Sequence, residues 1–150
     1  MGLIDEVGAG PVALDTCVFI YYIEEHPAFL PIVEPVFKAV DRGKLQAVTS
    51  DLTLLEVLVV PYRMGDVRLA EKYEALLTRS RGLSVVGLSR SLLRGAARIR
   101  AAAGLKTPDA IQVATALAAG CTSLVTADRN IPDIGGLRIV DLAAAHRREP

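Results

Sequence analysis

Cysteine is scarce in this sequence of 150 residues, which contains only Cys17 and Cys121. The two lie far apart, and neither a CxxC pair nor the mixed cysteine and histidine spacing of a zinc site is present. Each stands among apolar residues, where a free cysteine packs as a small hydrophobic side chain. The pattern argues against a structural zinc site and favours the reducing cytoplasm, with a disulfide between the two as the minor alternative.

Long apolar runs and export signals are absent as well. The longest apolar run, LTLLEVLVV at 52–60, is interrupted by Glu56 and is much shorter than the roughly 20 residues that a membrane-spanning helix needs. The N-terminal MGLIDEVGAG has neither the basic start nor the apolar segment of a signal peptide, and Glu6 stands where a myristoylation motif requires Ser or Thr. We therefore expect a soluble, cytoplasmic protein.

An excess of charge of either sign is also missing, because 17 Lys and Arg residues balance 17 Asp and Glu residues. A net charge of zero gives no general argument for nucleic-acid binding. The charges are unevenly placed, however, since residues 1–60 carry nine acids and three bases, whereas residues 61–106 carry ten bases and three acids. This distribution indicates an acidic pocket flanked by basic helices, or else ordinary solvated helix faces.

What the sequence does contain is a high proportion of hydrophobic residues, 51%, without repeats or low-complexity segments. A chain of this length and composition forms one domain that buries roughly two thirds of the surface exposed by the unfolded chain. We expect an ordered core at about residues 11–141 and loose ends.

Apolar periodicity and turn residues predict strands and helices that alternate along the chain. Strands are expected at 12–14, 45–50, 83–88, 121–126 and 137–142, and helices at 16–26, 31–41, 51–60 with an end or kink at Pro61, 66–80, 89–104 and 107–117. This alternation predicts an α/β fold, a single-domain α/β/α sandwich with a central parallel sheet and right-handed crossovers. Ligands of such folds bind at the carboxyl ends of the strands.

The segment LKTPDAIQVATAL at 105–117 is an apolar, largely buried helix that begins next to an acid. Thr107 suits the N-cap, Pro108 the first helical position and Asp109 the positive end of the helix dipole. Capping alone explains Asp109 in the simplest way, so a functional role requires other acids that converge on the same point.

Three further acids stand out. Asp15 follows the strand at 12–14, Asp128 follows the strand at 121–126, and Glu56 lies among aliphatic residues. Asp15 could instead cap a helix and Asp128 could begin a turn, but a buried, unpaired Glu56 would be costly. We expect a cluster with Asp109, whose like charges would raise one another's pKa unless a cation keeps them ionised.

The nature of the ligands indicates which cation this would be. Carboxylates without nearby cysteine or histidine select Mg²⁺ or Mn²⁺, and His26 and His146 lie in a turn and in the tail, away from the acids. A magnesium ion held in this way positions water and stabilises charge during phosphodiester hydrolysis. The residues therefore indicate a metal-dependent phosphodiesterase.

The segments VALDTCVFIYYI, KTPDAIQVATAL and LVTADRN, with the isolated Glu56 in a helix, occur in an order and spacing that resemble PIN-domain ribonucleases. The resemblance spans about residues 11–141 and is nearest to the VapC-type toxins of toxin–antitoxin pairs. It implies Mg²⁺- or Mn²⁺-dependent cleavage of RNA to 5′-phosphate and 3′-hydroxyl ends. It also implies that the catalytic and metal-binding residues are Asp15, Glu56, Asp109 and Asp128.

Other residues are expected to support this site. Cys17 stands where members of the family often carry Asn or Ser, a difference that affects a supporting hydrogen bond rather than a metal ligand. Asp133 is either a further acid or, as we favour, a turn residue. Supporting polar groups are expected at Thr16, Thr126 and Asn130, and contacts with the RNA backbone at Arg94 and Arg98.

The resemblance further implies two protein partners, a cognate antitoxin and a second copy of the chain in a homodimer. The antitoxin would place an apolar segment in a groove between the early helices and direct a basic side chain at the acids. Tyr21, Tyr22 and Phe29 either line this groove or pack in the core.

Two other functions are compatible with parts of the pattern. A receiver domain or a haloacid-dehalogenase-like phosphatase would use Asp15 as a covalent phosphate acceptor. The phosphatase would require a second acid at position 17, where Cys17 stands, and the receiver would require a lysine where Asp128 stands. A catalytically silent PIN-like module that binds RNA or protein is the second alternative.

Overall fold

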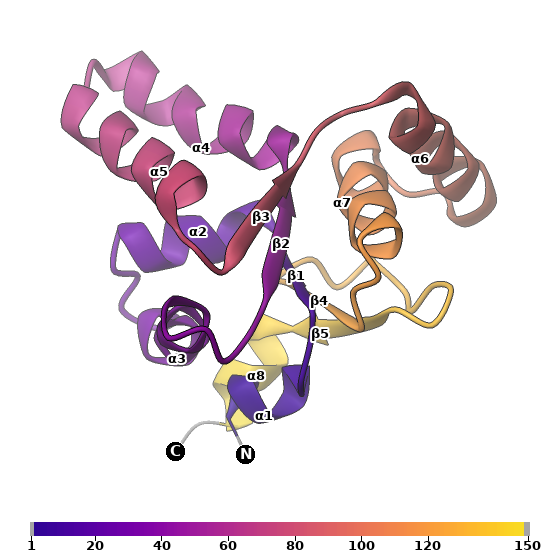
Figure 1. Ribbon diagram of the computed structural model, residues 1–150, viewed down its shortest axis with the longest axis horizontal. Coiled ribbons are helices and arrows are strands. Elements are labelled where there is room, and N and C mark those ends of the chain that lie inside the picture. Colours follow the sequence, from indigo (N-terminus) through magenta and orange to yellow (C-terminus); the bar gives the residue numbers. More distant parts are fainter. Residues whose placement is uncertain (1, 149–150) are drawn as a thin grey trace.

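Five short strands pair in parallel to form the central sheet, in the order β3-β2-β1-β4-β5. The computed structural model describes residues 2–148 and confirms the predicted α/β/α sandwich with a parallel sheet (Figure 1). The strands are β1 Val12–Leu14, β2 Ala47–Ser50, β3 Leu83–Val86, β4 Ser123–Thr126 and β5 Arg138–Asp141.

Helices connect the strands, as the alternating sequence pattern predicts. Their bounds are α1 Leu3–Val7, α2 Thr16–Ile23, α3 Leu30–Asp41, α4 Asp51–Met64, α5 Val67–Arg79, α6 Arg90–Ala103, α7 Thr107–Ala118 and α8 Leu142–Arg148. Within residues 2–148, no helix has both the length and the apolar character needed to cross a membrane.

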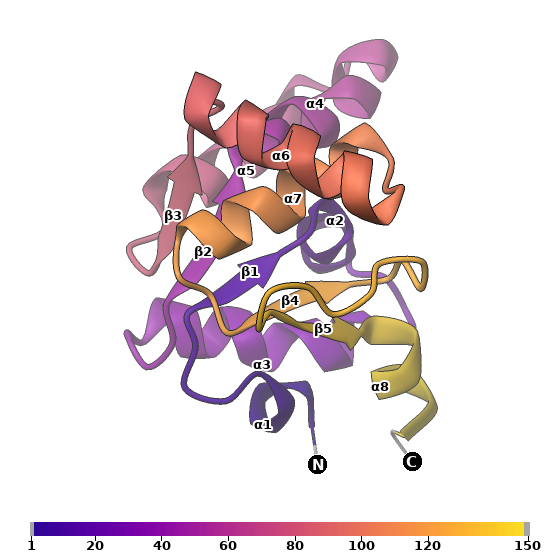
Figure 2. The ribbon, with the colours of Figure 1, turned by 90° about the vertical axis from the view of Figure 1, so that its right-hand side faces the viewer.

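Successive side chains of each strand point to opposite faces of the sheet, so the sheet separates two apolar cores. In β1, Val12 and Leu14 belong to the larger core, to which α1, α2, α3, α4, α5 and α8 contribute, whereas Ala13 belongs to the core formed with α6 and α7. Figure 2 shows α6 and α7 on one side of the strands and α1 and α3 on the other. The near-continuous burial of β1, β2 and β4 follows from this double coverage.

Pro61 does not end α4, because the helix continues to Met64 and stops at Gly65, whose φ of 69° is left-handed. A proline inside a helix removes one backbone hydrogen bond. Here Pro61 is buried, and its carbonyl accepts a hydrogen bond of 2.8 Å from the backbone N–H of Asp66, the residue before α5. Tertiary packing thus outweighs the local signal.

Both ends of the described chain form helices, whereas the sequence predicts loose ends. Leu3 and Val7 of α1 and Leu142 and Ala145 of α8 are buried in the larger core, and the Arg148 guanidinium pairs with the Glu6 carboxylate. Helices of this length are unstable alone and depend on burial. Their periodicity is too short to be recognised in the sequence.

Candidate functional site

Asp15 lies directly after β1, at the carboxyl edge of the sheet, and caps the N-terminus of α2. Its Oδ1 accepts a hydrogen bond of 2.8 Å from the backbone N–H of Thr16. Its Oδ2 accepts one of 2.7 Å from the hydroxyl of Thr126, the last residue of the adjacent strand β4. Burial raises the pKa of Asp15, while these two hydrogen bonds oppose the rise and the charge of Asp128 adds to it. The capping role and a functional role therefore coexist in this residue.

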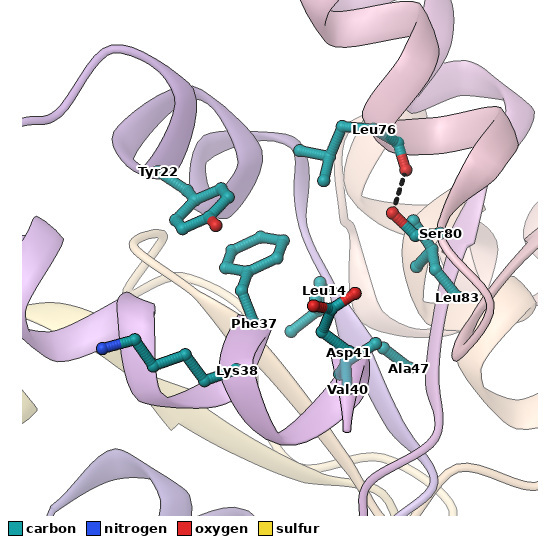
Figure 3. A pocket seen from close by; sticks show the side chains of 10 residues that line it. All are labelled: Leu14, Tyr22, Phe37, Lys38, Val40, Asp41, Ala47, Leu76, Ser80 and Leu83. Carbon is teal, nitrogen blue, oxygen red and sulfur yellow. Dashed lines mark hydrogen bonds between the residues drawn. The ribbon is translucent and has the colours of Figure 1, made fainter. Parts of the chain in front are cut away.

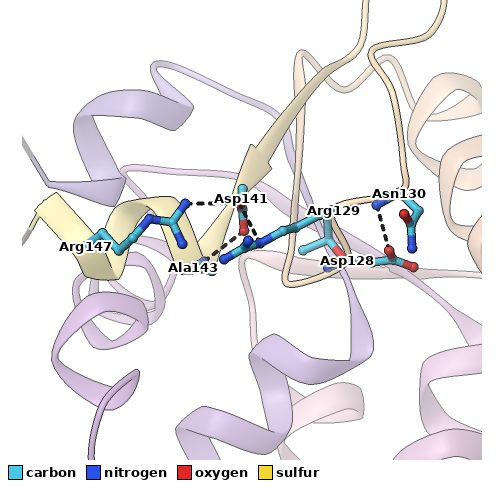
Figure 4. Close-up of polar contacts among 7 residues, drawn as sticks. Asp128, Arg129, Asn130, Asp141, Ala143 and Arg147 are labelled. Carbon is cyan, nitrogen blue, oxygen red and sulfur yellow. Dashed lines mark hydrogen bonds and ion pairs between the residues drawn. The ribbon is translucent and has the colours of Figure 1, made fainter.

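Asp128 stands two residues after the end of β4, and the Thr126 hydroxyl connects it to Asp15. The backbone N–H of Asp128 donates to Thr126 Oγ1 over 3.0 Å, and Asp128 Oδ1 accepts from the backbone N–H of Asn130 over 2.8 Å (Figure 4). The Asn130 N–H is the main cause of a lowered pKa of Asp128. Thr126 and Asn130 thus each donate a hydrogen bond to one of the acids.

Asp109 lies in the first turn of α7, but Thr107 is not its N-cap. Lys106 has extended backbone angles and takes that position, which makes Thr107 the first helical residue, and no side chain caps the helix at this position. The pKa of Asp109 is raised to about 7, first by burial, then by the neighbouring carboxylate of Asp128 and more weakly by Asp15, while Lys106 opposes the rise. Proximity to the other acids, rather than capping, characterises this residue.

Glu56 is half-buried on α4 and is not unpaired. Its Oε1 accepts a hydrogen bond of 2.7 Å from the hydroxyl of Thr16. Because the backbone N–H of Thr16 donates to Asp15, this one residue joins the Asp15 and Glu56 carboxylates. The sequence indicates that an unpaired, buried carboxylate at this position would be costly, and this charge-assisted hydrogen bond reduces that cost.

The acids gather at one edge of the sheet but do not form a closed cage. In the described part of the chain, no group of three Asp, Glu, His or Cys side chains is arranged so that it could hold a metal ion by itself. Asp15, Asp109 and Asp128 nevertheless affect one another's pKa. This all-oxygen set fits Mg²⁺ or Mn²⁺ in chemistry, because Mg²⁺ keeps several waters and uses only one or two carboxylates in many sites.

The remaining ligand candidates are engaged elsewhere. His26 and His146 pack against the Phe29 ring. Asp133 is exposed and its Oδ1 accepts from the backbone N–H of Ile139 over 2.9 Å, as a loop-closing residue would. Asp141, at the end of β5, accepts from the Ala143 N–H and faces Arg129 and Arg147 (Figure 4).

One basic residue near the acids, Lys106, is not indicated by the sequence. Lys106 is close enough to Asp109 and Asp128 to favour the ionised form of both. Arg94 and Arg98 are exposed on α6, which packs on α7 (Figure 1), and among residues 2–148 neither forms an ion pair with an acid. Sequence reasoning also missed Thr49, Thr53 and Gln112, which form buried hydrogen bonds beside Thr16.

A separate apolar pocket of about 140 Å³ lies on the face of the sheet that α2, α3 and α5 cover (Figure 3). Tyr22 and Phe37 stack at its side with ring centroids 4.0 Å apart, and Asp41 and Lys38 contribute polar atoms. Tyr21 stacks on Phe29 at 4.6 Å outside the pocket. The lining residues are Leu14, Tyr22, Phe37, Lys38, Val40, Asp41, Ala47, Leu76, Ser80 and Leu83.

Comparison with known proteins gives a family match over most of the chain. The sequence model of the family described as PIN domain matches residues 12–137. No curated protein sequence matches significantly.

Solved structures with a similar fold include three that are described in toxin–antitoxin terms. VapC20 from Mycobacterium tuberculosis, described as a sarcin-ricin loop cleaving toxin, superposes with a TM-score of 0.63 at 17% identity, over 89% of this chain and 94% of that one. VapBC2 from Rickettsia felis, bound to a promoter DNA fragment, gives 0.62 at 17% identity over 87% and 97%. A toxin–antitoxin complex from Klebsiella pneumoniae gives 0.64 at 20% identity over 84% and 94%. At these identities the likeness concerns the fold.

Proposed function

Since the chain belongs to the PIN domain family, we propose that it is a ribonuclease that hydrolyses RNA phosphodiesters with Mg²⁺ or Mn²⁺, as the toxin of a toxin–antitoxin pair. The observation that carries the proposal is the convergence of Asp15, Asp109 and Asp128 at the carboxyl edge of the parallel sheet. PIN nucleases generally use divalent metal ions. Such a convergence of carboxylates is unfavourable without a cation.

Each acid has a role that follows from its contacts. Asp15 is held on both oxygens by Thr16 and Thr126, so it presents a fixed carboxylate to the cation. Asp128 stays ionised because Asn130 lowers its pKa, whereas the pKa of Asp109 is raised to about 7, so a nearby cation would favour its ionised form. Glu56 supplies the fourth carboxylate from α4. A divalent cation at this edge would stabilise the charge that develops on the phosphate during hydrolysis.

The neighbours of Asp15 also bear on the alternative activities. A phosphatase that uses Asp15 as a covalent phosphate acceptor would require a second acid at position 17, where Cys17 stands. Burial raises the pKa of the Cys17 thiol to about 12, with the charge of Asp15 as the second cause, so Cys17 is not a nucleophile either.

The direct test is cleavage of total cellular RNA by the purified chain with Mg²⁺ or Mn²⁺ and with EDTA. Wild type should give discrete cuts only with the metal, and Asp15→Asn should abolish them because it removes a carboxylate while keeping the shape of the side chain. Glu71→Gln, an exposed acid on α5, is the control and should cut normally. Metal-independent cutting, or equal cutting by Asp15→Asn, would contradict the proposal, and Mn²⁺ binding without any cutting would favour the silent module.

We also propose that Arg94 and Arg98 contact the RNA backbone. Both are exposed, four residues apart on α6, and so project from the same side of the helix. Replacing both with Gln should weaken binding of a catalytically inactive Asp15→Asn chain to RNA. It should also reduce the slope of log K against log salt concentration by about 0.7 for each lost phosphate contact on single-stranded RNA. An unchanged slope in a filter-binding titration would argue against this surface.

An antitoxin partner is supported by the structural neighbours from Rickettsia felis and Klebsiella pneumoniae, which are described as toxin–antitoxin assemblies. The apolar pocket between α2, α3 and α5 suits one apolar side chain of such a partner, with the Asp41 carboxylate available to a neighbouring basic group. Coexpression with the product of an adjacent small gene should yield a complex that no longer cuts RNA. Leu83→Glu should weaken that complex, and an unaffected complex would exclude the pocket.

A homodimer is supported by apolar side chains that α4 and the start of α5 expose. Leu55, Tyr62, Met64 and Val67 are each more than 60% exposed, and exposed apolar residues gathered in this way mark protein interfaces. Figure 1 shows the α4–α5 pair projecting from the body of the molecule. Sedimentation equilibrium should give twice the chain mass, and Tyr62→Lys with Met64→Lys should give the monomer. A wild-type monomer at all concentrations would refute the dimer.

A further inference from the structure

A buried polar network lies beside the acids and connects four elements. Thr49 of β2, Thr53 of α4 and Gln112 of α7 are 1%, 0% and 2% exposed, and Thr16 of α2 joins them to Glu56. Gln112 stands one turn after Asp109 on the same helix, within a mostly apolar segment that contacts β1 and β2. A buried amide among aliphatic side chains is costly unless it is hydrogen-bonded, so its partners indicate what it does.

The donor of each hydrogen bond on the Thr49 side of the network can be assigned, because the last acceptor on that side is a backbone carbonyl oxygen, which cannot donate. The Thr49 hydroxyl lies 2.8 Å from the carbonyl oxygen of Leu14, which can only accept, so Thr49 uses its single proton there. In the 2.8 Å contact between Thr49 and Thr53, Thr53 must then be the donor. Gln112 Nε2 donates to Thr53 Oγ1 over 2.9 Å.

The other side of the network is ordered in the same way. The Thr16 hydroxyl donates its single proton to the Glu56 carboxylate over 2.7 Å. Gln112 Nε2 lies 3.5 Å from Thr16 Oγ1 and directs its second N–H there. The Thr16 and Thr53 oxygens are 3.3 Å apart, yet both of their protons point elsewhere. The Gln112 amide lies against both oxygens and gives one proton to each.

We propose that Gln112 is a positioning residue that keeps the Thr16 proton on Glu56. Without the amide, the Thr16 hydroxyl could turn its proton 3.3 Å away to Thr53, and the Glu56 carboxylate would lose the hydroxyl donor that fixes it. Gln112 thus sets the orientation of a proposed metal ligand from another helix, without touching the metal or the RNA. The inference rests on the proposed function, because it assigns Gln112 a task at the same carboxylates.

A purely structural role would require only that Gln112 fill space and satisfy its own amide. Thr115, on the same helix, gives a direct comparison. It is 1% exposed, but its hydroxyl donates over 2.7 Å to the carbonyl of Ile111, within its own helix. Thr115 therefore satisfies a buried polar group without reaching another element, whereas Gln112 reaches two.

The test measures Mn²⁺ binding by isothermal titration calorimetry on the full chain without RNA, together with the melting temperature in EDTA. Gln112→Met keeps the length and volume of the side chain but removes the amide. We expect it to weaken Mn²⁺ binding by roughly 10- to 100-fold, the usual effect of losing a group that orients a ligand. Thr115→Val is the matched control and should bind Mn²⁺ as wild type does.

A double-mutant comparison separates positioning from general damage to the fold. In the Glu56→Gln background, Gln112→Met should weaken Mn²⁺ binding no further, because its effect passes through the Glu56 carboxylate. Should Gln112→Met fail to fold, Gln112→Leu replaces it, with the same expected loss of Mn²⁺ affinity. Thr53→Val removes the hydroxyl to which the Thr16 proton would otherwise turn, so in that background loss of the Gln112 amide should weaken Mn²⁺ binding far less.

Three outcomes would overturn the inference. Gln112→Met could bind Mn²⁺ as wild type does, Thr115→Val could lose as much affinity, or the effects of Gln112→Met and Glu56→Gln could simply add. The proposed function fails in a different way, because a wild-type chain that neither binds Mn²⁺ nor cuts RNA removes both proposals together. A wild type that binds and cuts, with an unaffected Gln112→Met, removes only this one.

Discussion

The Asp109→Asn variant should be more stable than wild type in EDTA and at least about 100-fold slower in metal-dependent RNA cleavage. The loss of activity follows from the loss of one of the proposed metal-binding carboxylates. The gain in stability follows because burial and the charges of Asp128 and Asp15 raise the pKa of Asp109 to about 7, so its ionised form is unfavourable in the metal-free fold.

The pH dependence of this gain has a definite sign. Asp109 ionises at its ordinary pKa of 3.8 when the chain is unfolded and at about 7 when it is folded. The raised pKa of Asp109 therefore leaves the free energy of unfolding unchanged below pH 3.8. It lowers this free energy progressively as the pH rises to about 7, and has no further effect above that pH. Asparagine does not titrate, so its advantage should grow across that window and level off.

Thermal unfolding in EDTA between pH 4 and pH 8 measures the difference directly. Glu71→Gln, which neutralises an exposed acid outside the site, serves as the control and should not show the same growth with pH. An Asp109→Asn chain that is less stable than wild type at pH 8 would mean that Asp109 serves mainly to hold the first turn of α7. Unimpaired cleavage by the variant would remove Asp109 from the catalytic set.

Addition of Mn²⁺ or Mg²⁺ should stabilise the wild-type chain by an amount that its acids determine. An ion that binds only the folded state adds about 2.7 kcal/mol when its concentration is 100 times its dissociation constant. For a domain of this size, that corresponds to a rise in melting temperature of roughly 5–10 °C. The physical cause is that the cation offsets the repulsion among Asp15, Asp109 and Asp128.

Differential scanning fluorimetry at pH 7.5 with and without the ion measures this rise. Asp15→Asn and Asp109→Asn should each reduce it strongly, whereas Asp133→Asn should not, because the Asp133 carboxylate is bound to the backbone N–H of Ile139. KCl at a concentration that gives the same ionic strength is the control. A rise of equal size in Asp15→Asn would show that the ion binds elsewhere on the protein.

Several parts of this site could be predicted because they depend on local patterns. Asp15 and Asp128 come one and two residues after apolar segments that form strands of a parallel sheet, and the carboxyl ends of such strands meet at one edge. Asp109 could be predicted as a candidate because an acid near Pro108 in an apolar helix is conspicuous. The predicted PIN family is confirmed by the match over residues 12–137.

Other features could not be predicted because they depend on which elements become neighbours. Glu56 pairs with Thr16, which lies 40 residues earlier, and Gln112 reaches Thr16 across 96 residues. Lys106 becomes the N-cap of α7 and a neighbour of two acids only through the path of the loop after α6. Such contacts leave no periodic pattern in the local sequence.

The sequence by itself determined the α/β class and the parallel sheet, because backbone preferences and the alternation of apolar residues act within a few positions. Only the tertiary structure decided that Pro61 stays inside α4, that both ends of the described chain are helical, and that the acids are held by Thr16, Thr126 and Asn130. These outcomes depend on burial and on hydrogen bonds between distant segments. These interactions contribute to the free energy of folding only when the sheet has brought the distant segments together.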